Sequence, residues 1–144
     1  MMIHENMVEG KLMKTVQRLD KRVFKGVTTE YFLLRRYRLD KVSKTMHIMR
    51  LGQSNPDLSL NLTESGNRVI NVEEHVSSQL VINYKSFFKR ELKSDIEIPQ
   101  EYSFPLVVRL EENQIMMLWI STEFERSVWA KTFRDMILTN SPYA

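Results

Sequence analysis

The sequence contains no cysteine, few glycines and prolines, and no apolar run long enough to span a bilayer. Without cysteine the chain has neither disulfides nor thiolate metal sites, so its stability has to come from a packed core. A transmembrane helix is excluded, and the N-terminus lacks the basic start and apolar middle of a signal peptide. These absences favour a reducing compartment, and we expect a cytoplasmic location.

The charge of the chain is unevenly distributed. With 144 residues, 42% of them apolar and 27% charged, the chain has the size and composition of one globular domain. Residues 1–50 hold 12 Lys/Arg against 5 Asp/Glu and residues 51–144 hold 9 against 13, so +7 is followed by −4 within a net charge of +3. This asymmetry predicts one basic surface, which attracts phosphate on a lipid or a nucleic acid. A merely solvated charged face is the alternative.

Short β-prone runs fill most of the chain and are separated by turns rich in Gly, Asn and Pro. The clearest alternation is LSLNL, which places Leu58, Leu60 and Leu62 on one face. FPLVVRL alternates in the same way, whereas IMMLWI is apolar on both faces. Seven strands are predicted, at residues 8–15, 29–38, 44–51, 58–62, 68–72, 104–110 and 115–120.

The pattern after residue 120 is helical. Four apolar side chains recur at helical spacing and form one stripe, namely Trp129, Phe133, Met136 and Ile137. Thr122 and Glu125, three residues apart, form a capping box that marks the start of the helix. The sequence therefore predicts a C-terminal helix whose apolar stripe packs on the sheet.

The segment 75–95, between the fifth and sixth predicted strands, has a mixed pattern. Apolar side chains recur at mostly three- and four-residue intervals from Val76 to Leu92, with lysines and an arginine among them. This spacing favours an inserted amphipathic helix. A pair of strands is the competing interpretation, because residues 80–83 and 84–88 are β-prone.

A seven-stranded antiparallel sheet cannot leave two apolar faces open, so the predicted fold is mostly β with α: a barrel or sandwich capped by the C-terminal helix. The order of parts resembles the pleckstrin homology (PH) domain. The resemblance is carried by EGKLMK in the first strand, EYFLLRR in the second, the LSLNL strand, and VWAKTFRDMI with Trp129 in the closing helix. It covers residues 8–140, between an N-terminal extension at 1–7 and a tail at 141–144.

The resemblance implies a module that binds anionic phospholipid headgroups, either phosphatidic acid or a phosphoinositide. In PH domains that bind phosphoinositides, a lysine late in the first strand and cations entering the second strand converge on the phosphates. Lys14 matches the first position, but Thr28 and Glu30 stand where the second-strand cations belong. A carboxylate roughly 4 Å from a phosphate costs about 4 kcal/mol at an effective dielectric constant of about 20, which argues against a high-affinity pocket.

The cations gather instead in the first loop, around Phe24. Phe24 could insert among acyl chains while its basic neighbours contact phosphates; a loop that the cations merely solvate is the alternative. The predicted lipid-binding residues are Lys14, Arg18, Lys21, Arg22, Phe24, Lys25, Arg36 and Lys44. Four or five loop cations contribute about 1 kcal/mol each, so binding should be weak, salt-sensitive and dependent on a second anchor. The sequence shows no acylation site.

The main alternative function is a PH-like scaffold that binds a protein partner without lipid. Its predicted interface is Tyr84, Phe87 and Phe88 in the inserted segment. We expect no enzyme, cofactor or metal site, because the three histidines are widely separated and neither a phosphate-binding glycine loop nor a hydrolase motif occurs. Nucleic-acid binding is disfavoured, since the rings beside the second-strand cations are expected to pack inward.

Overall fold

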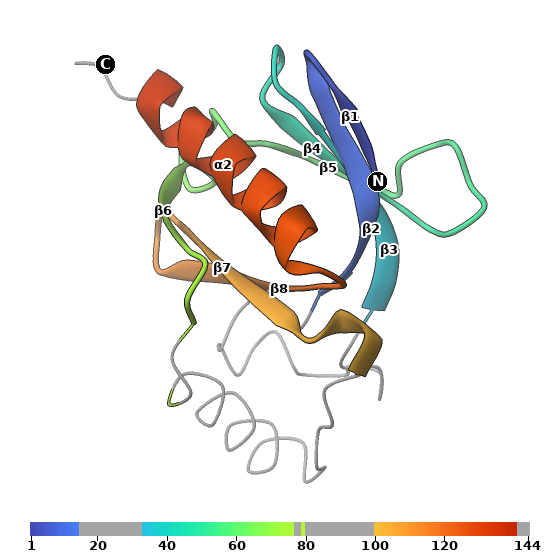
Figure 1. The fold of residues 1–144 in the computed structure, drawn as a ribbon. Helices are drawn as coiled ribbons and strands as arrows, with labels where there is room; N and C mark the ends of the chain where they lie inside the picture. The colour runs from blue at the N-terminus through green and yellow to red at the C-terminus, as the bar shows by residue number, and fades with distance from the viewer. Residues whose placement is uncertain (15–32, 77–78, 80–99, 141–144) are drawn as a thin grey trace, which may run out of the picture.

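The computed structural model describes residues 1–14, 33–76, 79 and 100–140. Its antiparallel strands form two layers, and a C-terminal helix lies across them (Figure 1). The strands are β1 (Met2–His4), β2 (Met7–Lys14), β3 (Leu33–Asp40), β4 (Thr45–Met49), β5 (Leu58–Asn61), β6 (Val69–Glu73), β7 (Phe104–Leu110) and β8 (Gln114–Ile120). The 3₁₀ helix η2 (Gln100–Tyr102) precedes β7, and the helix α2 (Glu123–Asn140) follows β8. The predicted antiparallel sheet with a closing helix is thereby confirmed.

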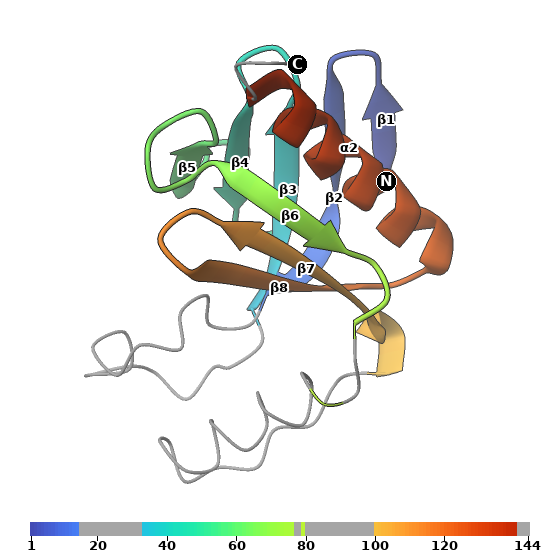
Figure 2. The same cartoon turned by 90° about the vertical axis from the view of Figure 1, so that its left-hand side faces the viewer.

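The long strand β2 connects the two layers. Hydrogen-bonded strands follow the order β5-β4-β3-β2-β8-β7-β6, and β1 pairs with β2 off this path. Along its whole length β2 pairs with β3, but it pairs with β8 only at Met13 and Lys14. The strands β2, β3 and β4 therefore cross β6, β7 and β8 steeply, as Figure 2 shows.

All seven predicted strands are present, and their ends agree with the prediction to within two residues wherever the structure describes them. Residues 29–32 of the second predicted strand lie outside the described residues. The additional strand is β1, which the sequence places in an N-terminal extension. All three of its residues are exposed, so β1 lacks the alternation of apolar and polar side chains by which the other strands are recognised.

The core lies between the two layers and beneath α2. Leu106, Val108 and Leu110 of β7 are fully or almost fully buried in it, as their alternation predicts. LSLNL departs from prediction at its first position, because Leu62 is buried but Leu58, at the start of the edge strand β5, is 46% exposed. On β7 and β8, Val107 and Met117 face each other on the side away from this core and are also buried. IMMLWI is therefore apolar on both faces because side chains on both faces of β8 are buried.

The predicted capping box holds the start of α2. The Thr122 Oγ1 accepts a hydrogen bond from the Glu125 N–H at 3.1 Å, and the Glu125 carboxylate accepts one from the Ser121 hydroxyl at 2.7 Å. Further along, Trp129 is fully buried and packs against Phe133, with 6.3 Å between the ring centroids. The stripe predicted from the sequence is thus the face that α2 turns to the sheet.

The indole ring of Trp129 packs against Gly10 of β2. A Cβ atom at Gly10 would lie 3.5 Å from Cζ2 and 3.7 Å from Nε1 of the indole ring. These are ordinary contact distances for a methyl group, but a branched side chain would displace the ring. At its other end α2 is tied to β6, because Arg134 donates to the Glu74 carboxylate at 2.5 Å and to the Val72 carbonyl at 3.3 Å.

The predicted inserted helix falls almost entirely on residues 77–78 and 80–99, which lie outside the described part of the chain. Nothing in the described residues bears this prediction out. No helix among those residues is long and apolar enough to cross a bilayer.

Candidate phospholipid-binding end of the barrel

One end of the sheet, called here the loop end, is where β2 finishes, β3 begins and β4 finishes. Lys14 is the last residue of β2 and pairs with Leu33, the first residue of β3. Met49, the last residue of β4, pairs with Arg36 of β3. Lys14 and Leu33, which flank the first loop (residues 15–32), therefore both lie at the loop end, where the connection 50–57 between β4 and β5 also begins.

Most of the predicted lipid-binding side chains lie outside the described residues. The backbone of Lys14 is placed at the end of β2, opposite both Leu33 of β3 and Leu118 of β8, but its side chain is not described. Also outside the described residues are Arg18, Lys21, Arg22, Phe24, Lys25, Thr28 and Glu30. Their grouping remains a prediction from the sequence.

Arg36 lies near the loop end, but its guanidinium is already engaged. Its Nε is 3.4 Å from a carboxylate oxygen of Glu9, and its Nη2 donates to the Gln53 carbonyl at 2.5 Å. The side chain of Arg36 is 32% exposed. A phosphate would have to compete with these partners, so Arg36 is better suited to fixing the connection 50–57 than to gripping a headgroup.

Lys44 lies away from the other predicted lipid-binding residues that the structure describes. It lies in the turn between β3 and β4, next to Asp40, and that turn is at the opposite end of β3 from Leu33. The eight residues of β3 span about 23 Å at about 3.3 Å per residue. Lys44 therefore cannot contact a headgroup together with Lys14.

Asp40 stabilises this distal turn. Its carboxylate Oδ1 accepts hydrogen bonds from the Val42 N–H at 3.0 Å and the Ser43 N–H at 3.1 Å, while Lys44 takes a φ of 53°. The hydrogen bond from the Ser43 backbone is the main reason that the pKa of Asp40 lies below its usual value.

Replacing Asp40 by alanine is expected to lower the free energy of unfolding by about 1 kcal/mol at neutral pH, because two turn amides lose their acceptor. Since the folded-state pKa is depressed, Asp40 stabilises the fold above its unfolded-state pKa, and this contribution is lost as the pH falls through the folded-state value. Urea unfolding of the parent and of Asp40→Ala at neutral and acidic pH measures the difference. If Asp40→Ala lowered the free energy of unfolding by the same amount at neutral and acidic pH, this account would be contradicted. Asp40→Asn, which keeps one acceptor oxygen, is the matched control.

No family model and no curated protein matches the sequence. Its architecture nevertheless matches solved structures over almost its entire length. The C-terminal PH domain of human pleckstrin superposes with a TM-score of 0.57 at 16% identity, covering 93% of this chain and 89% of that one. The chain has the fold of a PH domain. The resemblance inferred from four sequence motifs is thereby confirmed at the level of fold.

Two further PH structures show the range of settings in which this fold occurs. The C-terminal PH domain of pleckstrin in complex with D-myo-Ins(1,2,3,5,6)P5 matches at 14% identity and a TM-score of 0.55, covering 94% of this chain and 99% of that one. A structure on the structural role of the PH and C1 domains of the Vav1 exchange factor matches at 17% identity and a TM-score of 0.54. There the match covers 94% of this chain and 26% of that one.

Two arginines of this PH-like domain lie at the loop end but are absent from the predicted site. Arg35 precedes Arg36 on β3 and donates from Nη1 to the Leu34 carbonyl at 2.9 Å. Arg50 directly follows β4, and its Nε is 3.2 Å from a carboxylate oxygen of Asp57 in an exposed pair. Both arginines could have been predicted to lie here from the positions of the strand ends. In an antiparallel pair the start of one strand lies beside the end of its neighbour, so the start of β3 and the end of β4 share one end of the sheet.

The ring of Tyr37 packs into the core. Tyr37 lies on β3 between Arg36 and Arg38, is almost fully buried in the core, and has its pKa raised by that burial. A ring buried in this way offers no surface on which a base could stack. Among the described residues, no three metal-ligating side chains come together either.

A cavity of about 350 Å³ in the PH-like domain is lined by residues of β1, β2, β3 and the start of α2. Its lining carries both signs of charge, with Lys11 and Arg36 opposed by Glu9 and Glu125. Because Glu9 already pairs with Arg36, the local field does not favour an anion. We therefore do not include this cavity in the candidate phosphate site. The residues of the alternative partner interface, Tyr84, Phe87 and Phe88, lie outside the described residues.

Proposed function

We propose that this PH-like domain is a peripheral membrane-binding module that recognises anionic phospholipid headgroups through its first loop. The observation that supports the proposal is the position of Lys14 and Leu33, the described residues on either side of that loop. Residues 15–32 connect Lys14 to Leu33, which lie at one end of a PH fold, and they belong to residues 1–50, which carry the charge excess of +7. Location on the cytoplasmic face of a membrane would follow from this activity.

The proposed site is smaller than the sequence alone suggests. It comprises Lys14, Arg18, Lys21, Arg22, Phe24 and Lys25. Arg36 is left out because its guanidinium is held by Glu9 and Gln53, and Lys44 is left out because it lies at the far end of β3. Five cations at about 1 kcal/mol each give weak binding, so a second anchor is needed for stable residence on a membrane.

The headgroup class follows from the charge of the site. The pleckstrin domain solved with an inositol pentakisphosphate has the same fold, which supports a phosphate ligand. Glu30, at a position where PH domains that bind phosphoinositides carry a cation, disfavours a deep pocket for several ring phosphates. Phosphatidic acid or a mixed anionic surface therefore fits this domain at least as well as a phosphoinositide.

Glu30 also supports the second candidate, a PH-like scaffold that binds a protein partner through Tyr84, Phe87 and Phe88. The Vav1 comparison concerns a PH domain with a structural role in a larger protein. Under this alternative, Phe87→Ala with Phe88→Ala would abolish partner binding, whereas loss of the loop cations would leave it intact.

Sedimentation with vesicles tests the proposed function. The domain is expected to pellet with vesicles that contain phosphatidic acid in phosphatidylcholine, to pellet less as salt is raised, and to remain in solution with phosphatidylcholine alone. Equal pelleting with both vesicle types would refute recognition of the headgroup charge. A titration of labelled protein with a soluble phosphoinositide headgroup, followed by NMR, would then show whether the signals of the first-loop residues shift.

A further inference from the structure

The edge of β2 that faces away from β3 is interrupted between its two neighbouring strands. On this edge β1 pairs with β2 only as far as Glu9, and β8 pairs with it only at Met13 and Lys14. Residues 10–12 lie between these two contacts. They pair with β3 on their other side, but on this side they pair with no strand of the described residues. We call residues 10–12 the edge gap.

The start of α2 explains why β8 does not fill the edge gap. In the register of β8, Ser121 would lie opposite Lys11. The chain turns there instead, because the Ser121 hydroxyl donates to the Glu125 carboxylate at 2.7 Å and the Thr122 hydroxyl accepts from the Glu125 N–H at 3.1 Å. The capping box therefore directs the chain away from β2 and leaves the edge gap open.

Lys11 directs its backbone N–H and C=O into the edge gap. The Lys41 N–H donates to the Asn6 carbonyl at 2.8 Å, and the pairing of β2 with β3 continues from there without a register shift. The N–H and C=O of even-numbered residues in β2 therefore pair with β3, and those of odd-numbered residues point to the opposite edge. Within the part of the chain that the structure describes, no backbone group bonds to Lys11 across this edge. One donor and one acceptor are thus available in the edge gap.

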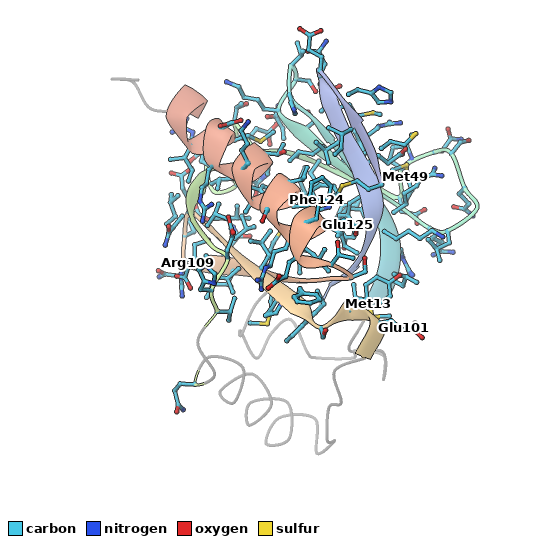
Figure 3. All side chains as sticks on the ribbon, in the orientation of Figure 1. Met13, Met49, Glu101, Arg109, Phe124 and Glu125 are labelled. Carbon is cyan, nitrogen blue, oxygen red and sulfur yellow. The ribbon has the colours of Figure 1, made fainter. Side chains whose placement is uncertain are left out.

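The cavity of about 350 Å³ opens beside the edge gap. Gly10 and Lys11 line this cavity together with Glu125, which lies on the first turn of α2 (Figure 3). Met2, which is 49% exposed, adds an apolar contact from β1. The volume falls in the range of pockets that bind ligands, so the space beside Lys11 can accept a short stretch of extended chain.

The carboxylate of Glu125 lacks a counter-ion in this cavity. Glu9 lies 3.4 Å from Arg36, whereas the Glu125 carboxylate accepts a hydrogen bond from Ser121 and forms no ion pair with any described residue. The side chain of Lys11 is exposed, so its ammonium can extend into water while its backbone stays at the edge gap. A carboxylate without a counter-ion in a partly enclosed site attracts a positively charged group.

We propose that the edge gap binds an extended peptide segment with a basic side chain, contributed by a partner protein. One residue of the peptide forms backbone hydrogen bonds with the N–H and C=O of Lys11, as in β-strand addition, and a lysine or arginine of the peptide pairs with the Glu125 carboxylate. The backbone contact selects an extended chain, and the carboxylate selects its charge. This site shares no residue with the first loop or with Tyr84, Phe87 and Phe88, so the inference depends on neither candidate function.

Titration with a defined peptide, followed by amide NMR, tests the site. The probe is a blocked hexapeptide of alternating valine and lysine, and the same peptide with glutamate in place of lysine is its control. At saturation the lysine peptide is expected to slow solvent exchange of the Lys11 N–H roughly tenfold, because this N–H gains an acceptor. The Leu12 N–H, which already pairs with β3, should keep its exchange rate. Unchanged exchange of Lys11 at millimolar peptide, or an equal response to the glutamate peptide, would overturn the proposal.

Glu125→Gln separates the charge of Glu125 from its role at the start of α2. Glutamine keeps an acceptor oxygen for Ser121 and is itself a capping-box residue, so the helix should be retained. The affinity for the lysine peptide is expected to fall roughly tenfold, since a charge-assisted hydrogen bond is lost. Glu123→Gln is the matched control, because it removes a 75% exposed carboxylate from the same turn, and it should change the affinity less than about twofold. Equal losses in the two variants, or no loss in Glu125→Gln, would contradict the site.

Discussion

Replacing Lys21, Arg22 and Lys25 together by alanine is expected to weaken binding to anionic vesicles by roughly 100-fold. Each cation close to an anionic surface contributes about 1 kcal/mol, and about 1.4 kcal/mol corresponds to a factor of ten. The effect should be seen as a shift of the sedimentation curve to higher lipid concentration. Binding to phosphatidylcholine alone should stay at its low level, because only the charge of the loop has changed.

Lys44→Ala is the matched control for this experiment. It removes one cation from the same basic segment, residues 1–50, but at a position about 23 Å along β3 from the loop end. This distance exceeds the screening length of about 8 Å at physiological salt, so the vesicle affinity should change by less than about twofold. If Lys44→Ala weakened binding as much as each loop substitution does, net charge rather than the first loop would govern binding, and the proposed site would be wrong.

The fold could be predicted from the sequence because successive side chains along its strands point alternately to water and to the core. Leu106, Val108 and Leu110 show this period, and Trp129 and Phe133 show the change to a helical one, so burial imposes both patterns on the sequence. β1 gave no such signal, because none of its three residues is buried. Its existence depends on pairing with β2, which is a property of the backbone rather than of the side chains.

The site was harder to predict because it depends on the register and direction of strands. Arg36 is neutralised by Glu9, a residue 27 positions earlier that lies on the neighbouring strand β2. No local pattern shows such a pairing. Lys44, by contrast, could have been excluded from strand order alone, since consecutive connections in an antiparallel meander lie at opposite ends of the sheet.

Removing the side chain of Trp129 is expected to have the largest effect on stability. Trp129→Ala should lower the free energy of unfolding by about 3–5 kcal/mol, since large buried aromatic side chains cost this much on truncation. The indole ring is fully buried between Gly10 of β2 and Phe133 of α2, so the cavity would open at the contact that holds the helix to the sheet. Domains of this size are stable by about 5–15 kcal/mol in total, so Trp129→Ala would unfold at much lower urea concentration.

Trp129→Phe distinguishes the packing of this ring from its polar atom. The Nε1 of Trp129 is buried and has no hydrogen-bond partner among the described residues, so the parent already bears the cost of one unpaired donor. Phenylalanine removes that donor while keeping an aromatic ring against Gly10, and its net cost should therefore be less than half that of alanine. Urea unfolding followed by circular dichroism measures both variants. Equal losses for alanine and phenylalanine would mean that the full indole shape, rather than burial of an aromatic ring, holds α2 on the sheet.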